Sequence, residues 1–549
     1  MRKLWSFKGG LKLDGHKAMS MHSPIAQAPI PAQLILPLHQ HIGEAAYPIV
    51  EVGDRVLTGQ MIGQAEGFVS APVHASSSGT VVAIEERPIA HPSGISDLCI
   101  VIDTDGKDEW IATPSHKDTY KRMDPSGLRN LIRDAGIVGL GGAGFPTFIK
   151  LNPGSSKSIS TLILNGVECE PYITCDAMLM QEQAREIIDG MMIMRHALQA
   201  KQCIIAIEDN KPASINAMQA ALSEQEKTII DIAIVPTRYP AGSEKQLIKT
   251  VTGVELAANQ LPVHHGIVCH NVGTAVAVGQ AILTGKPLIS RVVTVTGHAI
   301  QQPMNLIARI GTPMQDLLEA AQCDNTARVR LIMGGPMMGF AVEDDQSPIT
   351  KTTNCLLVPV ANDIPVEQPA MPCIRCGDCA RACPAQLLPQ QLYWYAHAKD
   401  FEKTQQYNLF DCIECGCCSA VCPSHIPLVQ YYRFAKTEIW AQERDKQKSD
   451  IARERHEFRQ YRLERKKQED EERRRKKQEL LNRSKKDKNK DKDDKQDAIS
   501  AAMARVNAKK AQQTAQPKNT DNLTEQQQKQ IDEADQRRQQ QATKKEANP

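Results

Sequence analysis

The sequence lacks long apolar runs and any surplus of charge of one sign. Aromatic residues make up only 4% of its 549 residues, and Lys and Arg (66) nearly balance Asp and Glu (64). This balance gives no general attraction to nucleic acid, so we expect no nucleic-acid partner. The nearest candidate for a membrane span, residues 266–283, is interrupted by His270, Asn271 and Gln280. It falls short of the ~20 apolar residues that a span needs, so any association with a membrane should be peripheral.

A secretory leader is also not indicated. Residues 1–17 carry basic side chains, but no apolar segment follows them. We therefore expect the protein to stay in the cytoplasm, where thiols remain reduced. Sixteen cysteines in such a chain indicate metal ligation rather than disulfides, and nine of them lie between Cys373 and Cys422.

Three folded regions are predicted ahead of the clustered cysteines. Residues 1–115 hold short alternating apolar runs between glycine-containing turns, which is typical of a small all-β unit. Residues 120–290 alternate helical periodicity with buried-strand runs, which indicates an α/β domain with a parallel sheet. Residues 291–360 open with a strand-like run and continue with a helical one, so we expect a small α+β unit there.

The last part of the chain offers almost nothing to bury. Residues 362–435 contain the clustered cysteines and should form a domain of their own. In residues 436–549 Lys, Arg, Glu, Asp and Gln dominate, and such a composition does not form a core. We expect a solvated helix over residues 440–482, held by charge pairs four residues apart, and disorder in the remainder.

Two copies of one cysteine motif carry the clearest chemical signal. Both follow C-x2-C-x2-C-x3-C-P, beginning at Cys373 and at Cys412. Three closely spaced thiolates can hold three irons of a cubane, and the fourth cysteine, followed by proline, reaches the other cluster. The motifs therefore predict two [4Fe–4S] clusters with exchanged fourth ligands. The first cluster takes Cys373, Cys376, Cys379 and Cys422, and the second takes Cys412, Cys415, Cys418 and Cys383.

A pair of zinc sites is the alternative, because C-x2-C pairs also bind zinc. Zinc requires neither a third cysteine at the same spacing nor a repeated Cys-Pro, so the spacing favours iron–sulfur clusters. Cys417 is a surplus thiol that we expect to be a bystander beside the ligands. The other seven cysteines are scattered along the chain, and buried free thiols are their simplest interpretation.

A glycine-rich loop, GLGGAGFPTFIK, occupies residues 139–150. Closely spaced glycines let backbone N–H groups approach a phosphate, and Lys150 adds a positive charge. Such turns are common, so the loop alone is a weak indication. Further along, a predicted strand leads into Asn165, Glu168 and Glu170, at a position where α/β sheets bind cofactors. An acidic loop that is merely solvated is the alternative.

Together these segments resemble the 51 kDa flavin- and NADH-binding subunit of respiratory complex I. The resemblance implies a non-covalently bound FMN with its phosphate on the glycine loop, NAD(H) as substrate, and a nicotinamide ring beside Phe145. The implied catalytic residues are Phe145, Glu168 and Glu170, and the implied cofactor-binding residues are Gly139, Gly141, Gly142, Gly144, Lys150, Asn165, Gly242, Glu244, Asn271 and Thr274. Leu140, Val167 and Ser243 depart from the family's Arg, Asp and Glu. The resemblance therefore supports the flavin contacts more than the details of nucleotide recognition.

The complex I subunit ends in a single-cluster domain, whereas two cysteine motifs are present here. Over residues 1–435 the chain resembles the C subunit of the Rnf (Rsx) electron-transport complex, an ion-translocating ferredoxin:NAD oxidoreductase. Residues 170–176, 239–247, 291–297 and 334–339 carry this resemblance together with both cysteine motifs. It implies a multidomain α/β and α+β fold: a β barrel-sandwich, an FMN/NADH-binding domain, a small SLBB-like domain, a two-cluster ferredoxin-like domain and a charged tail.

The resemblance also implies an enzyme, a translocase subunit at the cytoplasmic face of the bacterial inner membrane. Electrons would pass between NADH, FMN and the two clusters. The implied partners are integral membrane and iron–sulfur subunits of the same complex, which couple electron flow to ion movement, and a ferredoxin-type carrier. Two alternatives stay open: an NADH dehydrogenase subunit that is not linked to ion pumping, and an iron–sulfur scaffold without flavin.

The first β unit is similar to the barrel-sandwich of biotinyl and lipoyl carriers at residues 52–60 and 71–81. Those carriers attach their cofactor to a lysine at a hairpin tip, and here the neighbourhood of His74 takes that place. No lysine occurs between Lys17 and Lys107, which excludes covalent biotin or lipoate. We expect this unit to be a docking scaffold.

Overall fold

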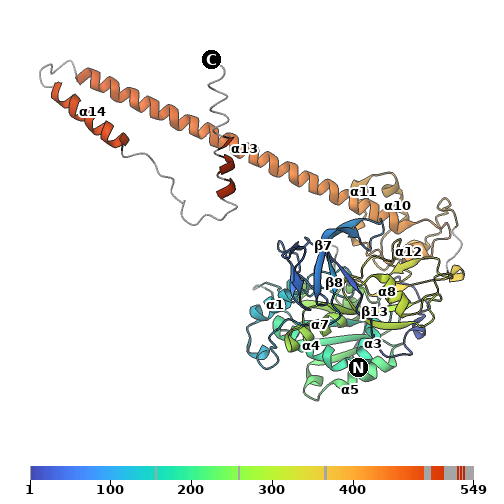
Figure 1. The fold of residues 1–549 in the computed structure, drawn as a ribbon. Coiled ribbons are helices and arrows are strands. Elements are labelled where there is room, and N and C mark those ends of the chain that lie inside the picture. The colour runs from blue at the N-terminus through green and yellow to red at the C-terminus, as the bar shows by residue number, and fades with distance from the viewer. Residues whose placement is uncertain are drawn as a thin grey trace. The chain divides into compact units, whose positions relative to one another are not determined.

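The computed structural model describes residues 2–154, 157–257, 260–363, 368–487, 496–511, 528–530, 532–534 and 536–537 (Figure 1). The chain divides into two compact units, Met1–Glu443 and Arg444–Pro549. Among the described residues, no helix is both long and apolar enough to cross a membrane.

Two antiparallel sheets with a common core form the predicted β unit. One sheet has the strand order β2-β8-β7-β4 and the other the order β3-β5-β6. The strands are β2 (Gln33–Pro37), β3 (Tyr47–Pro48), β4 (Arg55–Val56), β5 (Met61–Gln64), β6 (Val73–His74), β7 (Gly79–Pro88) and β8 (Ser96–Thr104). Leu34 and Leu36 on β2 are fully buried beside Ile100 and Ile102 on β8. The short alternating apolar runs thus form the strands of a two-sheet sandwich, which confirms the predicted all-β unit.

The hairpin position that a carrier domain would expose is buried here. His74 on β6 is only 6% exposed. Beside it, the Nζ atom of Lys351 donates hydrogen bonds to the carbonyl oxygens of Pro72 and Gly136, both at 2.8 Å. Lys351 belongs to the third folded region and Gly136 to the second, so one side chain joins three regions. The β unit is therefore held against the rest of the protein rather than free to swing.

A four-stranded parallel sheet with the order β11-β10-β9-β12 forms the second region. Its strands are β9 (Thr161–Gly166), β10 (Gln202–Glu208), β11 (Ile230–Val235) and β12 (Ile267–Asn271). Leu162 and Leu164 pack into the core that contains α4 and α7, whereas Ile163 packs on the opposite face with α6. Both faces are covered, which explains why these strands are continuous apolar runs. The helices are α1 (Pro125–Asp134), α2 (Thr147–Lys150), α3 (Cys175–Glu182), α4 (Ala184–Leu198), α5 (Pro212–Ala221), α6 (Glu244–Thr252) and α7 (Val272–Thr284).

The third region is a six-stranded mixed sheet with the order β1-β14-β13-β17-β15-β16. Its elements are β1 (Ala26–Gln27), β13 (Ser290–Thr296), β14 (Met304–Arg309), β15 (Leu331–Met333), β16 (Phe340–Val342), β17 (Cys355–Leu357) and α8 (Met314–Ala320). β1 comes from the N-terminal segment and pairs in parallel with β14. This addition was not predictable from the pattern, because a two-residue strand has no measurable periodicity.

The rest of the N-terminal segment also runs across distant parts of the chain. The N–H of Gly10 donates to the carbonyl oxygen of Ala382 at 2.9 Å, and Leu11 forms a bridge with Tyr239. Gly9 has a φ of +67°, and a Cβ there would lie 2.5 Å from the carbonyl oxygen of Cys383. Only glycine fits so close to the cysteine-rich region.

Short helices arranged around the two cysteine motifs form the fourth region. They are α9 (Asp378–Ala382), α10 (Pro389–His397), α11 (Phe401–Gln406), α12 (Cys417–Ala420) and the start of α13 (Leu428–Asp487). Leu392, Leu409, Tyr432 and Ile439 are buried in its core. The core therefore continues past residue 435, because α13 begins inside this region and its first turns pack on the cysteine loops.

The second unit is helical and exposed where it is described. The α13 side chains from 444 to 481 are exposed or nearly so, and pairs such as Arg465–Glu469 and Arg475–Glu479 lie four residues apart. This part of the helix confirms the predicted solvated helix. A further helix, α14 (Gln496–Ala511), lies where the sequence predicted disorder. Its alanine-rich sequence has a high intrinsic helix propensity. The prediction of disorder considered only the low content of residues that could form a core.

Candidate functional site

The predicted cofactor residues meet where the parallel sheet reverses its strand order. The chain proceeds from β9 outward to β10 and β11, and β12 then lies on the other side of β9. In such sheets ligands bind at the carboxyl ends of the two strands that flank the reversal. Asn165 at the end of β9 and Asn271 at the end of β12 are register partners there.

The glycine loop lies directly over this strand end. A Cβ on Gly141 would lie 2.9 Å from the Asn271 side chain, and the N–H of Leu140 donates to Oγ1 of Thr274 at 3.0 Å. Asn271 caps α7 by accepting from the N–H of Gly273 at 2.8 Å. The N–H of Gly139 donates to the Phe145 carbonyl oxygen at 2.9 Å and closes the loop.

The outer edge of the loop is open. Gly141, Gly142 and Ala143 are exposed, and a Cβ on Gly142 would meet nothing within 4 Å. In the part of the chain that the structure describes, no acceptor is found for the N–H groups of Gly141, Gly142 and Ala143. Gly144, with φ of +72°, turns the chain back beneath His41 of the β unit. Free N–H groups on an exposed glycine turn form a concave donor surface for an anion.

Lys150 and Glu244, both predicted to bind cofactor, are paired with each other. Nζ of Lys150 lies 2.7 Å from Oε1 of Glu244 and donates to the Cys269 carbonyl oxygen at 2.9 Å. Burial acts to lower the pKa of Lys150, but the Glu244 carboxylate outweighs it and the pKa is raised. The lysine therefore stays charged beside the loop. Gly242 completes this edge, because its carbonyl oxygen accepts from Nδ2 of Asn165 at 2.8 Å.

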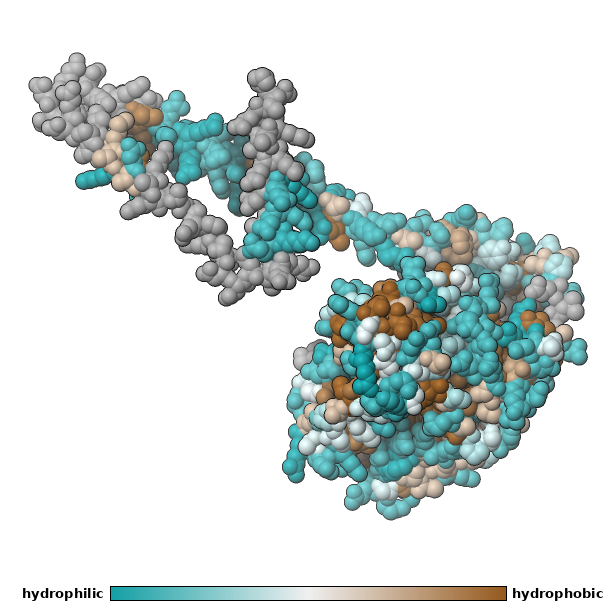
Figure 2. Space-filling model, viewed as in Figure 1, coloured by the Kyte–Doolittle hydropathy of each residue, from teal (hydrophilic) through white to brown (hydrophobic). Residues whose placement is uncertain are grey.

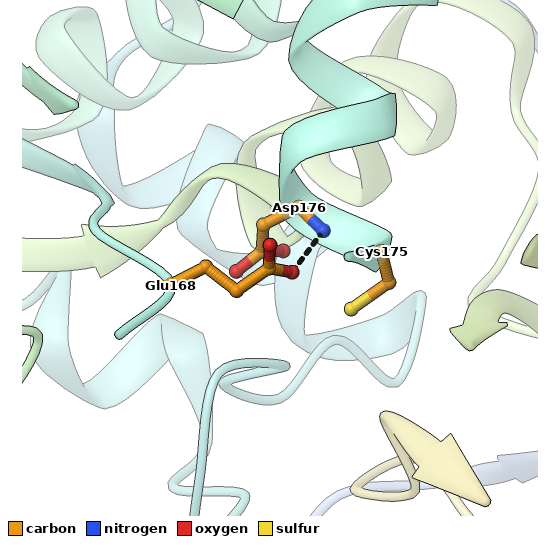
Figure 3. A group of neighbouring side chains, drawn as sticks. All are labelled: Glu168, Cys175 and Asp176. Carbon is orange, nitrogen blue, oxygen red and sulfur yellow. Dashed lines mark hydrogen bonds between the residues drawn. The ribbon is translucent and has the colours of Figure 1, made fainter. Parts of the chain in front are cut away.

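Glu168 lies in a buried group of charged side chains beneath the loop. Its Oε1 atom accepts from the N–H of Asp176 at 2.7 Å, and Cys175 lies beside both carboxylates (Figure 3). Its Oε2 atom has no hydrogen-bond partner among the described residues, and lies 3.7 Å from Nζ of Lys17 and 3.9 Å from Nζ of Lys211. The acidic loop is thus buried and paired, not merely solvated.

Glu170 points instead toward the third region. Its Oε1 atom accepts from the N–H groups of Met337 and Met338 at 2.7 and 3.0 Å. Burial raises the pKa of Glu170, although these hydrogen bonds act in the opposite direction. Glu170 therefore connects the strand end to the loop at residues 334–339, one of the stretches that carry the family resemblance.

The eight motif cysteines separate around two cavities. Cys373, Cys376, Cys379 and Cys422 line one cavity, and Cys383, Cys412, Cys415 and Cys418 line the other together with the surplus Cys417. Each predicted set of four thiols combines three cysteines of one motif with one cysteine of the other, which fits the ligands of a cubane cluster. Cys376 is exposed, whereas Cys415 and Cys418 are buried. The first cavity therefore lies nearer to solvent than the second.

The two cysteine loops are built alike. Arg375 and Glu414 both have positive φ (59° and 57°), and their N–H groups each lie 3.4 Å from the Sγ of the cysteine two residues earlier. Gly377 and Gly416 follow with φ of 80° and 79°. The repeated backbone conformation lets three thiols of each motif converge on one side of the loop.

The second cavity adjoins the flavin-type domain. The hydroxyl group of Tyr239 donates to the Cys415 carbonyl oxygen at 2.6 Å, and Lys245 forms an ion pair with Asp411 at 3.1 Å. Tyr239 packs in one apolar cluster with Cys415 and Cys417. The segment that supplies Gly242 and Glu244 therefore lies against the second cysteine loop.

Sequence reasoning missed several residues at this site. Asp176 and Arg291 lie in two of the stretches that carry the family resemblance, residues 170–176 and 291–297. Neither was predicted as a site residue, because a single charged residue there has no motif or spacing of its own. Lys17 lies in the turn η1 (Lys17–Met19) and donates to the carbonyl oxygens of Glu170 and Ile173. Nothing in the spacing of the sequence connects Lys17 to the acidic loop.

Comparisons with known families agree with these four regions. Residues 5–107 match the RnfC barrel sandwich hybrid domain, 132–280 the Nuo51 FMN-binding domain, 292–341 the SLBB domain and 372–426 the 4Fe-4S dicluster domain. The combination defines a class of electron-transfer protein that joins an FMN-binding domain to a dicluster domain. The C subunit of the ion-translocating oxidoreductase complex of Vibrio cholerae is 48% identical over 516 residues, which are 93% of this chain and 65% of that protein. The C subunit of the same complex from Pectobacterium atrosepticum is 43% identical over 92% of this chain and 71% of its own length. The chain belongs to this family of C subunits.

The chain spans about two thirds of the length of the curated relatives it matches (65% for the Vibrio cholerae protein). Among solved structures, a chain of an NAD+-reducing [NiFe]-hydrogenase is similar over 60% of this chain and 63% of its own, at 20% identity and a TM-score of 0.42. A likeness this slight supports no argument about fold or function.

Proposed function

We propose that this chain exchanges electrons between NAD(H), a non-covalently bound FMN and two [4Fe–4S] clusters, as a peripheral subunit of an ion-translocating complex. The relatives are named as subunits of such a complex, and the proposal transfers that role to this chain. It places the subunit at the cytoplasmic face of the inner membrane. Its partners are then membrane and iron–sulfur subunits and a ferredoxin-type carrier.

The free N–H groups of residues 141–143 are the observation that carries the flavin assignment. They lie at the strand reversal and have open space outside Gly142. An FMN phosphate bound there would accept from these groups, and Lys150 would add positive charge nearby. Asn165, Asn271 and Thr274 hold the loop and the strand ends in place. Phe145, Glu168 and Glu170 are the proposed nicotinamide-side residues.

Flavin, when bound, converts a two-electron hydride transfer into single-electron steps that a cubane can accept. The chain's own contribution is to place the second cysteine loop close to the proposed flavin site. Tyr239 and the segment that follows it lie against the second cysteine loop, so Cys383, Cys412, Cys415 and Cys418 would hold the cluster nearer the flavin. Cys373, Cys376, Cys379 and Cys422 would hold the more exposed cluster, which faces a partner.

Gly142→Val tests the flavin assignment cleanly. The new side chain would enter open space, so the fold should tolerate it while the phosphate position is blocked. In the anaerobic protein, dithionite should reduce both clusters and NADH should not, as followed by absorption and EPR spectra. Gly142→Ala, with one methyl group, should show a smaller loss. Equal reduction by NADH in Gly142→Val and wild type would remove the glycine loop from the electron path.

A further inference from the structure

A cavity adjoins Asp176, the residue next to Cys175 at the start of α3. Asp176 is half-buried, and its Oδ2 atom accepts from Nδ2 of Asn271 at 2.6 Å. Asp176 also lines this cavity, together with the loop residue Leu140. The remaining lining residues include Gln183, Gln280, Ser290 and Arg291. The Asp176 carboxyl group thus lies between this cavity and Asn271, the residue that supports the glycine loop.

Glu168 extends this arrangement toward the strand end. The closest ligand-type atoms of Glu168, Cys175 and Asp176 all lie within 4.8 Å of one another (Figure 3). Glu168 follows β9 at the strand reversal, where the proposed flavin site lies. A chain of two adjacent carboxyl groups therefore leads from that site to the cavity.

We propose that Glu168 and Asp176 form a proton-exchange relay between the flavin site and the cavity. The inference rests on the proposed function. Oxidation of the nicotinamide obeys NADH → NAD+ + H+ + 2 e−, and iron–sulfur clusters accept only the electrons. One proton per NADH is left at the site and must reach water. Glu168 accepts it, Asp176 passes it to the cavity, and the reverse flow supplies the proton when NAD+ is reduced.

The charges around the relay suit this role. Burial, aided by the Glu168 charge, raises the pKa of Asp176 to about 7, so the group can both take up and release a proton near neutral pH. Lys17, Lys211 and Glu208 surround Glu168, and Arg291 faces Asp176 from β13. Burial raises the pKa of the Cys175 thiol, which therefore stays protonated and outside the relay.

The same three side chains could suggest a bound cation, but the surroundings argue against it. The ammonium groups of Lys17 and Lys211 lie within 4 Å of Oε2 of Glu168. Two ammonium groups this close would repel a divalent ion.

Asp176→Asn removes the titrating group and keeps an oxygen that can accept from Asn271. In the full-length protein without NADH, infrared spectra of the wild type should contain a protonated-carboxyl band that disappears as pH rises through about 7. The band should be missing in Asp176→Asn. Asp118→Asn, a change at an exposed residue that does not line the cavity, should retain it.

Kinetics then test whether this group carries protons. NADH-driven cluster reduction in the wild type should accelerate as pH rises through about 7. In Asp176→Asn it should be about tenfold slower or more and nearly independent of pH, with reduction by dithionite unchanged. Acetic acid, small enough to enter the cavity, should restore part of the rate. Ala277→Leu, which fills the cavity and keeps both carboxyls, should slow the reaction and leave the infrared band in place.

Unchanged rate and pH profile in Asp176→Asn, with NADH still reducing the wild type, would overturn the relay alone. Failure of NADH to reduce the wild-type clusters that dithionite reduces would overturn the proposed function and the relay together. If Asp176→Asn does not fold, Ala277→Leu decides: wild-type kinetics in that variant would also overturn the relay.

Discussion

Lys351 carries an ammonium group in a place where almost no water reaches it. Burial lowers the pKa of this lysine to about 7, because its partners among the described residues are the neutral carbonyl groups of Pro72 and Gly136. In the unfolded chain the lysine keeps its ordinary pKa near 10.5. Between these values the unfolded state binds one proton more than the folded state, so stability rises with pH in this window.

We therefore expect the thermal midpoint of the wild type to rise between pH 7 and pH 9 relative to Lys351→Met. One proton corresponds to about 1.4 kcal/mol per pH unit, which is the slope that the variant should lose. Lys157→Met, at an exposed lysine, should retain the wild-type slope. A wild-type slope in Lys351→Met would show that this ammonium group is not the origin of the pH dependence.

Replacing single cysteines tests the exchange of fourth ligands. Cys422→Ala should damage the cluster of Cys373, Cys376 and Cys379, and Cys383→Ala should damage the other one, because each fourth cysteine lines the opposite cavity. Iron and acid-labile sulfide should fall from about eight each per chain to about four, with the EPR signal of one cluster lost. Cys417→Ala should keep both clusters. Loss of the second cluster in Cys422→Ala would disprove the exchange.

For single residues, the sequence predicted the grouping of the cysteines better than it predicted contacts between distant side chains. Spacing alone assigned eight cysteines to two sets, and the cavities bring the members of each set together, with Cys417 added to the second. Their roles as cluster ligands stay predictions. Pairings between distant residues were not predictable, such as Lys150 with Glu244 or Lys17 with the acidic loop, because they depend on tertiary packing. The roles of the flavin-site residues stay predictions.

At the scale of elements, α4 and α7 cross at unusually short distance. A Cβ on Gly190 of α4 would lie 1.8 Å from the carbonyl oxygen of Ala275 on α7, so the helices touch through backbone atoms. Asn271 and Thr274, which hold the glycine loop, lie at the start of α7. The spacing of the two helices therefore helps to position the proposed flavin site.

Gly190→Ala should force these helices apart and lower the free energy of unfolding by about 1 to 3 kcal/mol, the usual cost of overpacking a core. The thermal midpoint measures the effect, and FMN affinity should fall with it. In protein freed of FMN, Gly142→Ala is the matched change, because its methyl group meets nothing and should leave the midpoint unchanged. Equal midpoints in the two variants would contradict the close crossing.

Elements with clear periodicity were predictable, and elements without it were not. The runs at 161–164, 202–206 and 229–235 became β9, β10 and β11, because a strand buried on both faces must be apolar throughout. β1 was missed because its two residues are fixed only by pairing with β14. The helix α14 was not predicted, because its alanines favour a helix through intrinsic propensity but do not indicate a buried face.

At the scale of the whole molecule, the charged tail should be separable from the electron-carrying part. Truncation after Glu443, where the first unit ends, should leave iron content and NADH oxidation unchanged. Truncation after Ala435 removes Ile439 from the core and Lys436, whose Nζ donates to the Cys412 carbonyl oxygen and pairs with Glu414 at 2.7 Å. The shorter protein should lose the second cluster, as iron analysis and EPR would measure. Loss of both clusters in the longer protein would show that the tail is structural.

The N-terminal segment that reaches Tyr239 and Ala382 has a consequence for how the chain is made. It leaves the ribosome before Ala382, which is synthesised last among its partners, roughly 20 to 75 s later at ordinary rates of translation. Until then Gly9 and Gly10 lack their partners in the cysteine-rich region and remain open to proteases and chaperones. Their docking is one of the final events of biogenesis, after the second cysteine-lined cavity has begun to form. A segment that closes last can report that the metal-binding region has been built, so a chain without its clusters should retain a protease-sensitive N-terminus.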